Sequence, residues 1–165
     1  MLLWDVALGP DYELARASRR RLLRGWATSG TIAGAIFAPP CGGWMHTKVA
    51  AIADHIANAL LMCCISLCHM LHTLGRPWVL LAPDRSKFWT EKVTGILLRR
   101  KFVHSSITSS CAWGAGWRLD WRLVSSRLTF DFDCFLCKSW HGKCSFSSSR
   151  HDQFSSGVKS LPRAM

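Results

Sequence analysis

Acidic residues are scarce in this chain of 165 residues, which carries 10 Asp and Glu against 21 Lys and Arg. The formal net charge is therefore +11, and the sequence pI is near 9.8. An excess of this size favours polyanionic partners such as nucleic acid. It specifies no target sequence, because exposed Lys and Arg attract the phosphates of any nucleic acid.

Long apolar runs are also lacking, and this excludes a membrane-spanning helix. The longest uninterrupted run, residues 59–65, is far shorter than the ~20 residues that a span needs. The first residues do not show the charged segment, apolar stretch and cleavage site of a secretory signal. We therefore expect an intracellular protein, nuclear or cytoplasmic and not secreted, whose eight cysteines are reduced thiols.

The length and composition are those of one globular domain. With 49% hydrophobic residues, the chain is long enough to bury a core. Residues 145–165 differ from the rest because they are rich in serine and basic residues. We predict one domain over residues 1–144, followed by a disordered tail over 145–165.

Two short apolar segments predict buried strands of an α/β fold. Residues 32–38 and 78–82 contain no charge, and each is followed by proline, which cannot continue a sheet ladder. Uncharged segments of this kind are typical of strands buried on both faces of a parallel sheet. Between them, residues 47–74 place polar side chains at three- and four-residue steps, which predicts a helix capped by Gly75. Such a helix is the crossover that adjacent parallel strands require.

A thiol lies directly after the first of these strands. Cys41 stands in the sequence Pro-Pro-Cys-Gly-Gly, where glycines let the backbone pass close to another group. Ligands of α/β sheets bind beyond the carboxyl ends of the strands, so Cys41 is a candidate nucleophile. A free cysteine is more often a small buried residue, and that interpretation stays open.

Pro-Pro-Cys is one of four motifs that occur in order along the chain. They are Trp4-Asp5 with residues 9–14, residues 38–42, residues 75–80 with Pro83 and Trp89, and residues 111–118. A weaker match, Cys144 with His151 and Gly157, follows them. Together they resemble C5-cytosine DNA methyltransferases, and most closely the methyltransferase-like open reading frames of repetitive, retroelement-associated protist DNA. The resemblance implies a partial Rossmann-like methyltransferase fold, with a mainly parallel sheet flanked by helices.

The resemblance also implies a catalytic pair, of which this chain has lost one member. The relatives carry Glu-Asn-Pro where this chain reads Leu81-Ala82-Pro83. In cytosine methylation the cysteine, here Cys41, attacks ring carbon 6 while the glutamate protonates or hydrogen-bonds the ring nitrogen. Leucine offers no proton, and the loss of a general acid costs typically about 10²–10⁴-fold in rate. We therefore expect a domain without catalytic activity.

Asp5 is the predicted cofactor residue. An acidic residue at the end of a first strand can hydrogen-bond a ribose hydroxyl, roughly 20 residues after a glycine-rich turn. Counting back that far from Asp5 passes the first residue of the chain. We expect an amino-terminally truncated copy that does not bind S-adenosylmethionine, the cofactor of the family. The alternative is that Asp5 is an ordinary carboxylate at a strand end.

An aromatic loop near residue 115 is the predicted contact with nucleic acid. Trp113 and Trp117 enclose two glycines, Gly114 and Gly116, and Arg118 follows them. Bases stack on exposed tryptophan, and arginine binds phosphate. The alternative is that both tryptophans cover the edge of a sheet.

The last cysteines have a spacing that suits a metal. Cys134, Cys137, Cys144 and His151 form a Cys-x₂-Cys-x₆-Cys-x₆-His pattern, and three thiolates with one imidazole satisfy tetrahedral zinc. Against this, Cys134 points to the core face of a strand predicted over residues 129–135. Short spacings also recur by chance in a chain with eight cysteines.

Two functions from different classes fit these observations. The first is an inactive C5-cytosine methyltransferase-like domain, whose ancestral substrate is a flipped cytosine in DNA, so that DNA is favoured over RNA as a partner. The second is a basic, non-enzymatic nucleic-acid-binding protein with a small zinc site. A decayed reading frame without function is the third interpretation.

Overall fold

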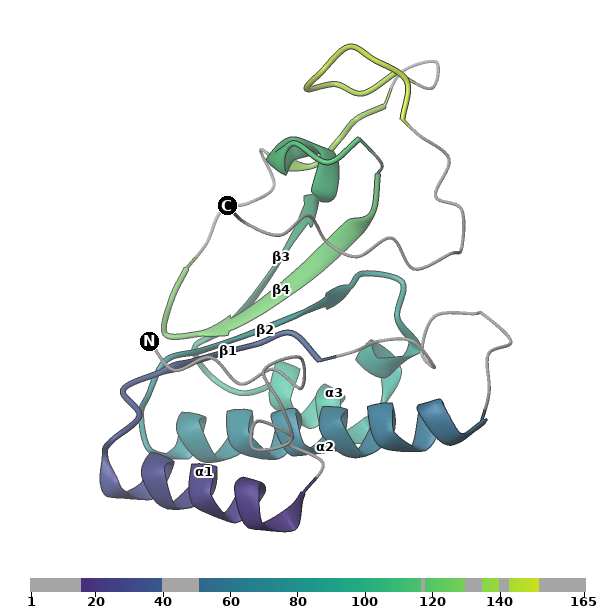
Figure 1. The fold of residues 1–165 in the computed structure, drawn as a ribbon. Coiled ribbons are helices and arrows are strands. Elements are labelled where there is room, and N and C mark those ends of the chain that lie inside the picture. Colours follow the sequence, from purple (N-terminus) through teal and green to yellow (C-terminus); the bar gives the residue numbers. More distant parts are fainter. Residues whose placement is uncertain (1–15, 40–50, 117, 130–134, 140–142, 152–165) are drawn as a thin grey trace.

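The computed structural model describes residues 16–39, 51–116, 118–129, 135–139 and 143–151. These residues form three α-helices, four strands and two short 3₁₀ helices (Figure 1). In chain order they are α1 (Ala17–Ser29), β1 (Ala35–Phe37), α2 (Ala51–Thr73), β2 (Trp78–Pro83), η4 (Lys87–Thr90), α3 (Lys92–Leu98), β3 (Val103–Ser109), η5 (Ser110–Trp113) and β4 (Asp120–Ser126).

The four strands form one mixed sheet in the order β1-β2-β4-β3. β1 pairs parallel with β2, whereas β4 is antiparallel to both β2 and β3. The predicted α/β class is therefore confirmed. The prediction of a mainly parallel sheet was wrong, because two of the three described strand pairings are antiparallel. The connection from β3 to β4 explains the difference. It contains only η5 and a short loop, whereas a parallel neighbour needs a crossover of a dozen or more residues.

The predicted crossover unit is confirmed. β1 and β2 lie side by side in parallel, with Phe37 opposite Leu80, and α2 connects them. Gly75 follows the helix with a φ of 71°, a left-handed conformation that glycine adopts without strain. No helix in the described part of the chain is both long and apolar enough to cross a membrane.

β1 is less buried than its sequence predicted. It is an edge strand of the described sheet, and Ile36 is 76% exposed. An uncharged segment was expected to be covered on both faces, but a strand of three residues at a sheet edge has a neighbour on one side only. β2 does have the expected burial, since Trp78, Leu80 and Ala82 are fully buried.

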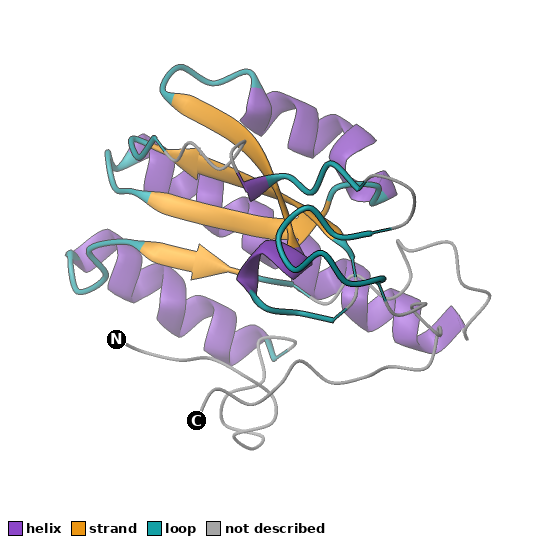
Figure 2. Ribbon diagram, turned by 90° about the horizontal axis from the view of Figure 1, so that it is seen from above, coloured by secondary structure: helices purple, strands orange, loops and turns teal. Residues whose placement is uncertain are grey.

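The three helices cover one face of the sheet. Figure 1 shows α1, α2 and α3 below the strands, and the view from above in Figure 2 shows the strands crossing in front of them. The main core lies between the two layers, where Leu61, Ile65 and Leu71 of α2 pack with Trp78 and Leu80 of β2. The described part of segment 135–151 lies elsewhere, over η5 and the ends of β3 and β4 (Figure 1). This segment therefore needs a source of stability other than the main core.

Candidate metal centre

Four metal-ligating side chains meet beyond the end of β3. They are Cys111, Cys137, Cys144 and His151, whose sulfur and imidazole nitrogen atoms all lie within 4.8 Å of one another. The three cysteines are buried, and His151 is half-buried. Three residues of the predicted set are thus brought together. The fourth predicted residue, Cys134, lies outside the described residues, and the described cluster takes its fourth group from Cys111.

The shortest distances match those around one tetrahedral ion. Sulfurs held about 2.3 Å from zinc lie about 3.8 Å apart at a tetrahedral angle, and a sulfur and an imidazole nitrogen lie about 3.5 Å apart. The sulfurs of Cys137 and Cys144 are separated by 3.9 Å, and the sulfur of Cys137 lies 3.6 Å from Nε2 of His151. The cluster therefore has nearly the dimensions of a closed coordination shell.

The end of β3 positions Cys111. The strand stops at Ser109, and the chain turns into η5, which ends at Gly114 with a φ of 88°. Ser110 closes this loop, because its N–H donates to the carbonyl of Leu119 at 2.9 Å and its hydroxyl accepts from the Leu119 N–H at 2.8 Å. Cys111 therefore lies on a short helical turn that is fixed by the hydrogen bonds between Ser110 and Leu119.

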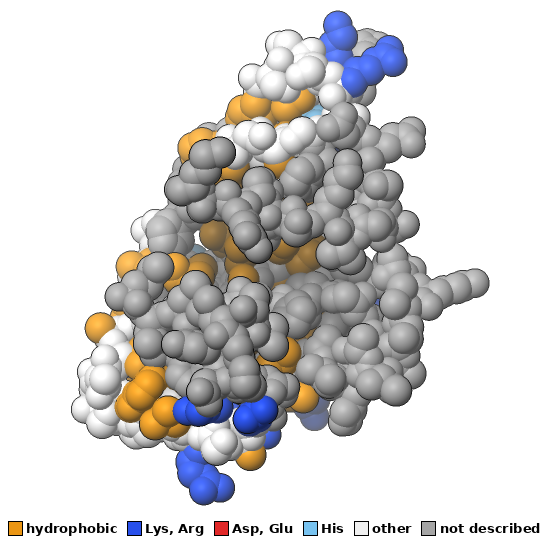
Figure 3. Space-filling model, viewed as in Figure 1, with side chains coloured by type: hydrophobic (Ala, Val, Ile, Leu, Met, Phe, Trp, Pro, Cys, Tyr) orange, Lys and Arg blue, Asp and Glu red, His pale blue; other side chains and the backbone are white. Residues whose placement is uncertain are grey.

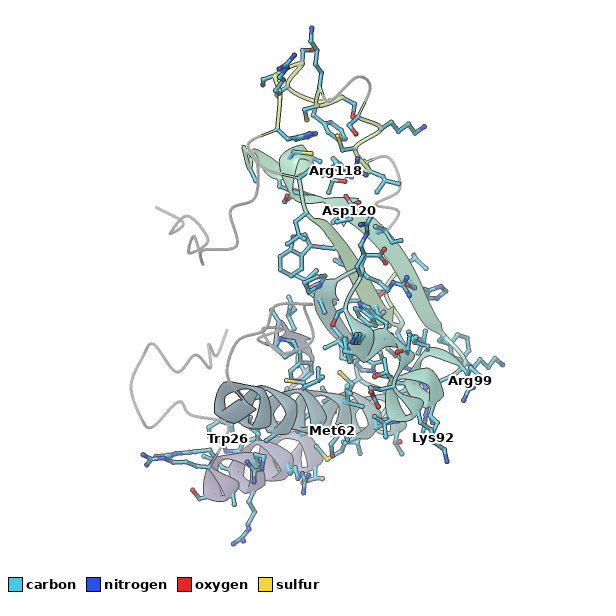
Figure 4. The ribbon with its side chains drawn as sticks, turned by 90° about the vertical axis from the view of Figure 1, so that its right-hand side faces the viewer. Trp26, Met62, Lys92, Arg99, Arg118 and Asp120 are labelled. Atoms are coloured by element: carbon cyan, nitrogen blue, oxygen red, sulfur yellow. The ribbon has the colours of Figure 1, made fainter. Side chains whose placement is uncertain are left out.

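A chain of hydrogen bonds positions Cys137. Its N–H donates to the hydroxyl of Ser109 at 2.9 Å, and that buried hydroxyl donates to Asp120 Oδ1 at 2.6 Å. Arg118 holds the carboxylate from the other side through an ion pair of 3.1 Å, and it also donates to Ser139 at 2.8 Å. Figure 4 shows Arg118 and Asp120 next to each other at this end of the molecule. Burial alone would raise the pKa of Asp120, but the hydrogen bonds from Arg118 and Ser109 lower it.

A tight turn presents Cys144 to the cluster. The N–H of Cys144 donates to the carbonyl of Ser149 at 2.7 Å, and an antiparallel bridge joins Lys143 to Arg150. Inside the turn, the N–H of Phe146 donates to the sulfur of Cys144 at 3.4 Å. The bridge also places the next residue, the imidazole of the cluster, beside the thiols.

The thiols differ in acidity. Burial alone would raise the pKa of Cys144, but hydrogen bonds from Phe146 and Ser147 lower it to about 6. Burial raises the pKa of Cys111 to about 12, and hydrogen bonding with Cys144 and Cys137 acts in the same direction. Because the thiolate is the form that binds metal, Cys144 is a ready ligand, and a bound dication would favour the thiolate of Cys111.

Comparison with known proteins finds no match. No protein-family model, no curated protein and no solved structure is similar to the chain. The resemblance to C5-cytosine methyltransferases therefore depends on the sequence motifs alone and stays a prediction. The metal cluster depends on geometry, and it is the best-defined chemical site among the described residues.

The predicted catalytic residues are described only in part. Leu81 lies towards the carboxyl end of β2, half-buried, and pairs with Leu123 of β4. Cys41 and Asp5 lie outside the described residues, so the proximity of Cys41 to Leu81 stays a prediction. The carboxylate that follows β2, Asp84, is held by Arg122 in an ion pair of 2.8 Å. Asp84 is therefore already engaged by a cation.

The predicted nucleic-acid residues are also described in part. Trp113 is 59% exposed and stacks on Phe135 with ring centroids 4.9 Å apart. Its indole N–H donates to Thr108 at 2.8 Å, so the ring is fixed but accessible. Trp117 lies outside the described residues. Arg118 is bound to Asp120, which gives it a positioning role, and its contact with phosphate stays a prediction.

The predicted metal site did not include Cys111, because the spacing pattern covers only the short segment of residues 134–151. Cys111 lies 26 residues before Cys137, and the fold brings the two together. A signal was present in the sequence, because Cys111 opens the last of the four methyltransferase-like motifs, and Cys144 and His151 belong to the weaker match that follows. Three of the four clustered residues, Cys111, Cys144 and His151, therefore lie in the motifs that resemble the methyltransferases.

Proposed function

We propose that this chain is a non-catalytic nucleic-acid-binding domain whose carboxyl-terminal part is held by a structural zinc ion. The observation that supports the proposal is the cluster of three cysteines and one histidine. Thiolate and imidazole are the ligands that zinc prefers, and four protein ligands close the tetrahedron. A closed shell leaves no position for substrate, so this zinc would have a structural role.

Zinc would supply stability that apolar burial does not supply here. Among the described residues, the buried cluster at this end of the molecule consists of three cysteines, which are small side chains. Small units with a small core generally need a metal or a disulfide, and metal binding then adds directly to folding stability. The ion would join η5 to the segment that contains Cys137, Cys144 and His151.

The surface around the cluster has the features of a single-strand binding site. Trp113 and Phe146 expose aromatic rings, and residues 138–150 contribute three exposed cations, Lys138, Lys143 and Arg150. Residues 135–151 contain no acidic residue. On the face shown in Figure 3, Lys and Arg side chains gather at this end of the molecule and over α1. Aromatic rings that stack bases, with cations that bind phosphates, are the usual parts of such a surface.

Zinc content is the direct test of the proposal. The chain, purified without added metal and with its thiols reduced, should carry one zinc per molecule by elemental analysis. Dialysis against a strong chelator should lower its melting temperature, and one equivalent of zinc should restore it. A folded chain without zinc, whose melting temperature is unchanged by the chelator, would overturn the zinc centre.

A second candidate function is favoured by the β1-α2-β2 unit. We propose that the sheet derives from a C5-cytosine methyltransferase-like domain that has lost its acid. β1, β2 and β3 run in one direction, β4 alone is reversed, and Leu81 stands where the resemblance places the glutamate.

Restoring the acid should restore covalent chemistry. With an intact cofactor-binding segment joined to the chain, Leu81→Glu together with Ala82→Asn should trap a 5-fluorocytosine oligonucleotide on gels. The parent fusion should trap at least about 100-fold less, the scale expected for a missing general acid. Cys41→Ser in the restored fusion is the matched control and should abolish trapping. Efficient trapping by the parent fusion would show that the missing glutamate does not matter.

A further inference from the structure

A strained turn presents a phenylalanine to solvent at the other end of β3. The N–H of Val103 donates to the carbonyl of Arg100 at 3.3 Å, which closes a four-residue turn. Its third residue, Phe102, has a φ of 63°, and this left-handed position in a turn usually holds glycine. A bulky side chain there is a real outlier. The ring is not driven there by burial, because Phe102 is 53% exposed.

The strain is repeated on the neighbouring strand. Arg127 directly follows β4 and also has a positive φ, 61°, and its N–H donates to the carbonyl of Phe102 at 3.0 Å. Phe102 and Arg127, which are joined by this hydrogen bond, thus both adopt a left-handed conformation that usually requires glycine. Strained positions of this kind cluster at ligand clamps and other functional sites, where surrounding structure maintains them.

Cations surround the exposed ring. Nζ of Lys101 lies 4.9 Å from the centre of the Phe102 ring, and the guanidinium of Arg127 lies 5.8 Å from it. Arg99 and Arg100 precede them and are exposed. Among the described residues, none of these four cations forms an ion pair with a carboxylate. The surface therefore combines an accessible aromatic ring with cations that are free to bind an anion.

The positive charges also affect the pKa of a neighbouring histidine. His72, near the end of α2, has a pKa that is lowered first by burial and then by the positive charges of Arg100 and Arg127. Its Nδ1 lies 3.0 Å from the hydroxyl of Ser126, the residue before Arg127. The ammonium of Lys101 and the guanidinium of Arg127 therefore belong to one positive region around the Phe102 ring.

We propose that Phe102 and the cations Arg99, Arg100, Lys101 and Arg127 form a second binding surface for single-stranded nucleic acid. Phosphates would bind the cations, and a base would stack on the Phe102 ring. The positive φ keeps that ring outside the core, where a base can reach it. Nucleic acid fits the surface because every nucleotide carries both a phosphate for a cation and a flat base for the phenylalanine ring.

This surface is separate from the metal centre. The seven residues of β3 stand between Phe102 and η5, which corresponds to roughly 20 Å along the strand. In Figure 4, Arg99 and Arg118 lie at different ends of the molecule. Binding here should therefore persist when zinc is removed, and this distinguishes the surface from the one proposed around the cluster.

The test uses Phe102→Gly, a change that removes the ring and relieves the strained turn. The melting temperature should stay the same or rise. In a Trp113→Ala background, which removes the stacking ring of the other proposed surface, the affinity for a labelled oligothymidine, measured by fluorescence anisotropy at low salt, should fall about 5- to 150-fold. Arg127→Gly also relieves strain and removes one cation, so it should reduce the slope of log affinity against log salt by about 1.

Controls separate this surface from charge in general. Lys87→Ala removes one exposed cation from η4, outside the surface, and should leave the affinity within about twofold of the parent. Phe102→Gly should also weaken binding to the same extent in chelator-treated chain. Unchanged affinity in a folded Phe102→Gly chain would show that Phe102 is a turn residue only and would overturn the proposal, whatever the result of the zinc experiment.

Discussion

Replacing Cys111 by serine is expected to remove zinc from the chain. A structural zinc site contributes about 10–16 kcal/mol of binding free energy in small peptides, so one of four ligands accounts for roughly 3 kcal/mol or more. Zinc affinity should therefore fall more than about 100-fold. If that energy is lost from folding, the melting temperature should fall by about 6–12 °C for a chain of this size. Zinc content and thermal unfolding, measured on the same preparation, check both effects.

Cys134→Ser is the matched control for that experiment. It removes one thiol from the pattern that the sequence spacing indicated, whereas Cys111→Ser removes one from the cluster that the fold assembles. Cys134→Ser should keep one zinc per chain and the parent melting temperature to within a few degrees. The opposite result, zinc lost with Cys134 and kept without Cys111, would favour the contiguous Cys-x₂-Cys-x₆-Cys-x₆-His pattern and contradict the cluster.

The affinity of the chain for single-stranded DNA is expected to fall steeply with salt. Each phosphate that a cation neutralises releases counterions, and the slope of log affinity against log salt is about −0.7 per phosphate of a single strand. Contacts with about six to ten phosphates therefore lose roughly 300- to 16,000-fold in affinity between about 50 and 200 mM salt. The formal charge of +11 and the two basic surfaces supply cations for contacts of that number. Anisotropy titrations with one labelled oligonucleotide at several salt concentrations give the slope.

A variant of Trp113 separates base stacking from the phosphate contacts that cause the salt dependence of the affinity. Trp113→Ala should weaken binding by about 1–3 kcal/mol, because a base loses its stacking partner, while the salt slope stays nearly constant. Affinity that does not change with salt would show that the positive charge is incidental. Affinity that changes with salt but not with Trp113→Ala would assign the tryptophan to packing on Phe135.

The sequence predicted the parts of the fold that follow from local pattern. The uncharged segments around β1 and β2 end at proline, and the periodic segment between them is long enough for only one role, a crossover helix. Gly30 and Gly75 end α1 and α2 in left-handed conformations, as helix-terminating glycines do. The α/β class and the parallel β1–β2 pair were therefore accessible from residues alone.

The remaining features depend on contacts between distant segments. β4 was not predicted, because its burial comes from lying between β2 and β3 and its own pattern of polar and apolar residues is irregular. The exposure of Ile36 likewise depends on the position of β1 at the edge of the described sheet. Phe102 is a bulky residue where a turn needs a positive φ, and no propensity rule predicts that. Local rules fail most often at strained and functional sites.

Part of the candidate metal site could be predicted from the sequence. The remaining part could not, because it depends on how the folded chain brings distant residues together. Spacing identified Cys137, Cys144 and His151, because a short segment can place nearby residues around one ion. Cys111 could not be chosen by spacing, since its position depends on where β3 ends and how η5 turns. The hydrogen bonds through Ser109 that position Cys137 became visible only in the folded chain.

X-ray absorption at the zinc edge tests the central claim most directly, because it counts the ligands around the metal. In the parent chain, the proposed site predicts three sulfurs at about 2.3 Å and one nitrogen at about 2.0–2.1 Å. In Cys111→Ser, any zinc that is bound should show one sulfur fewer. A parent spectrum dominated by oxygen ligands, or a sulfur count that stays the same without Cys111, would contradict a zinc centre built from Cys111, Cys137, Cys144 and His151.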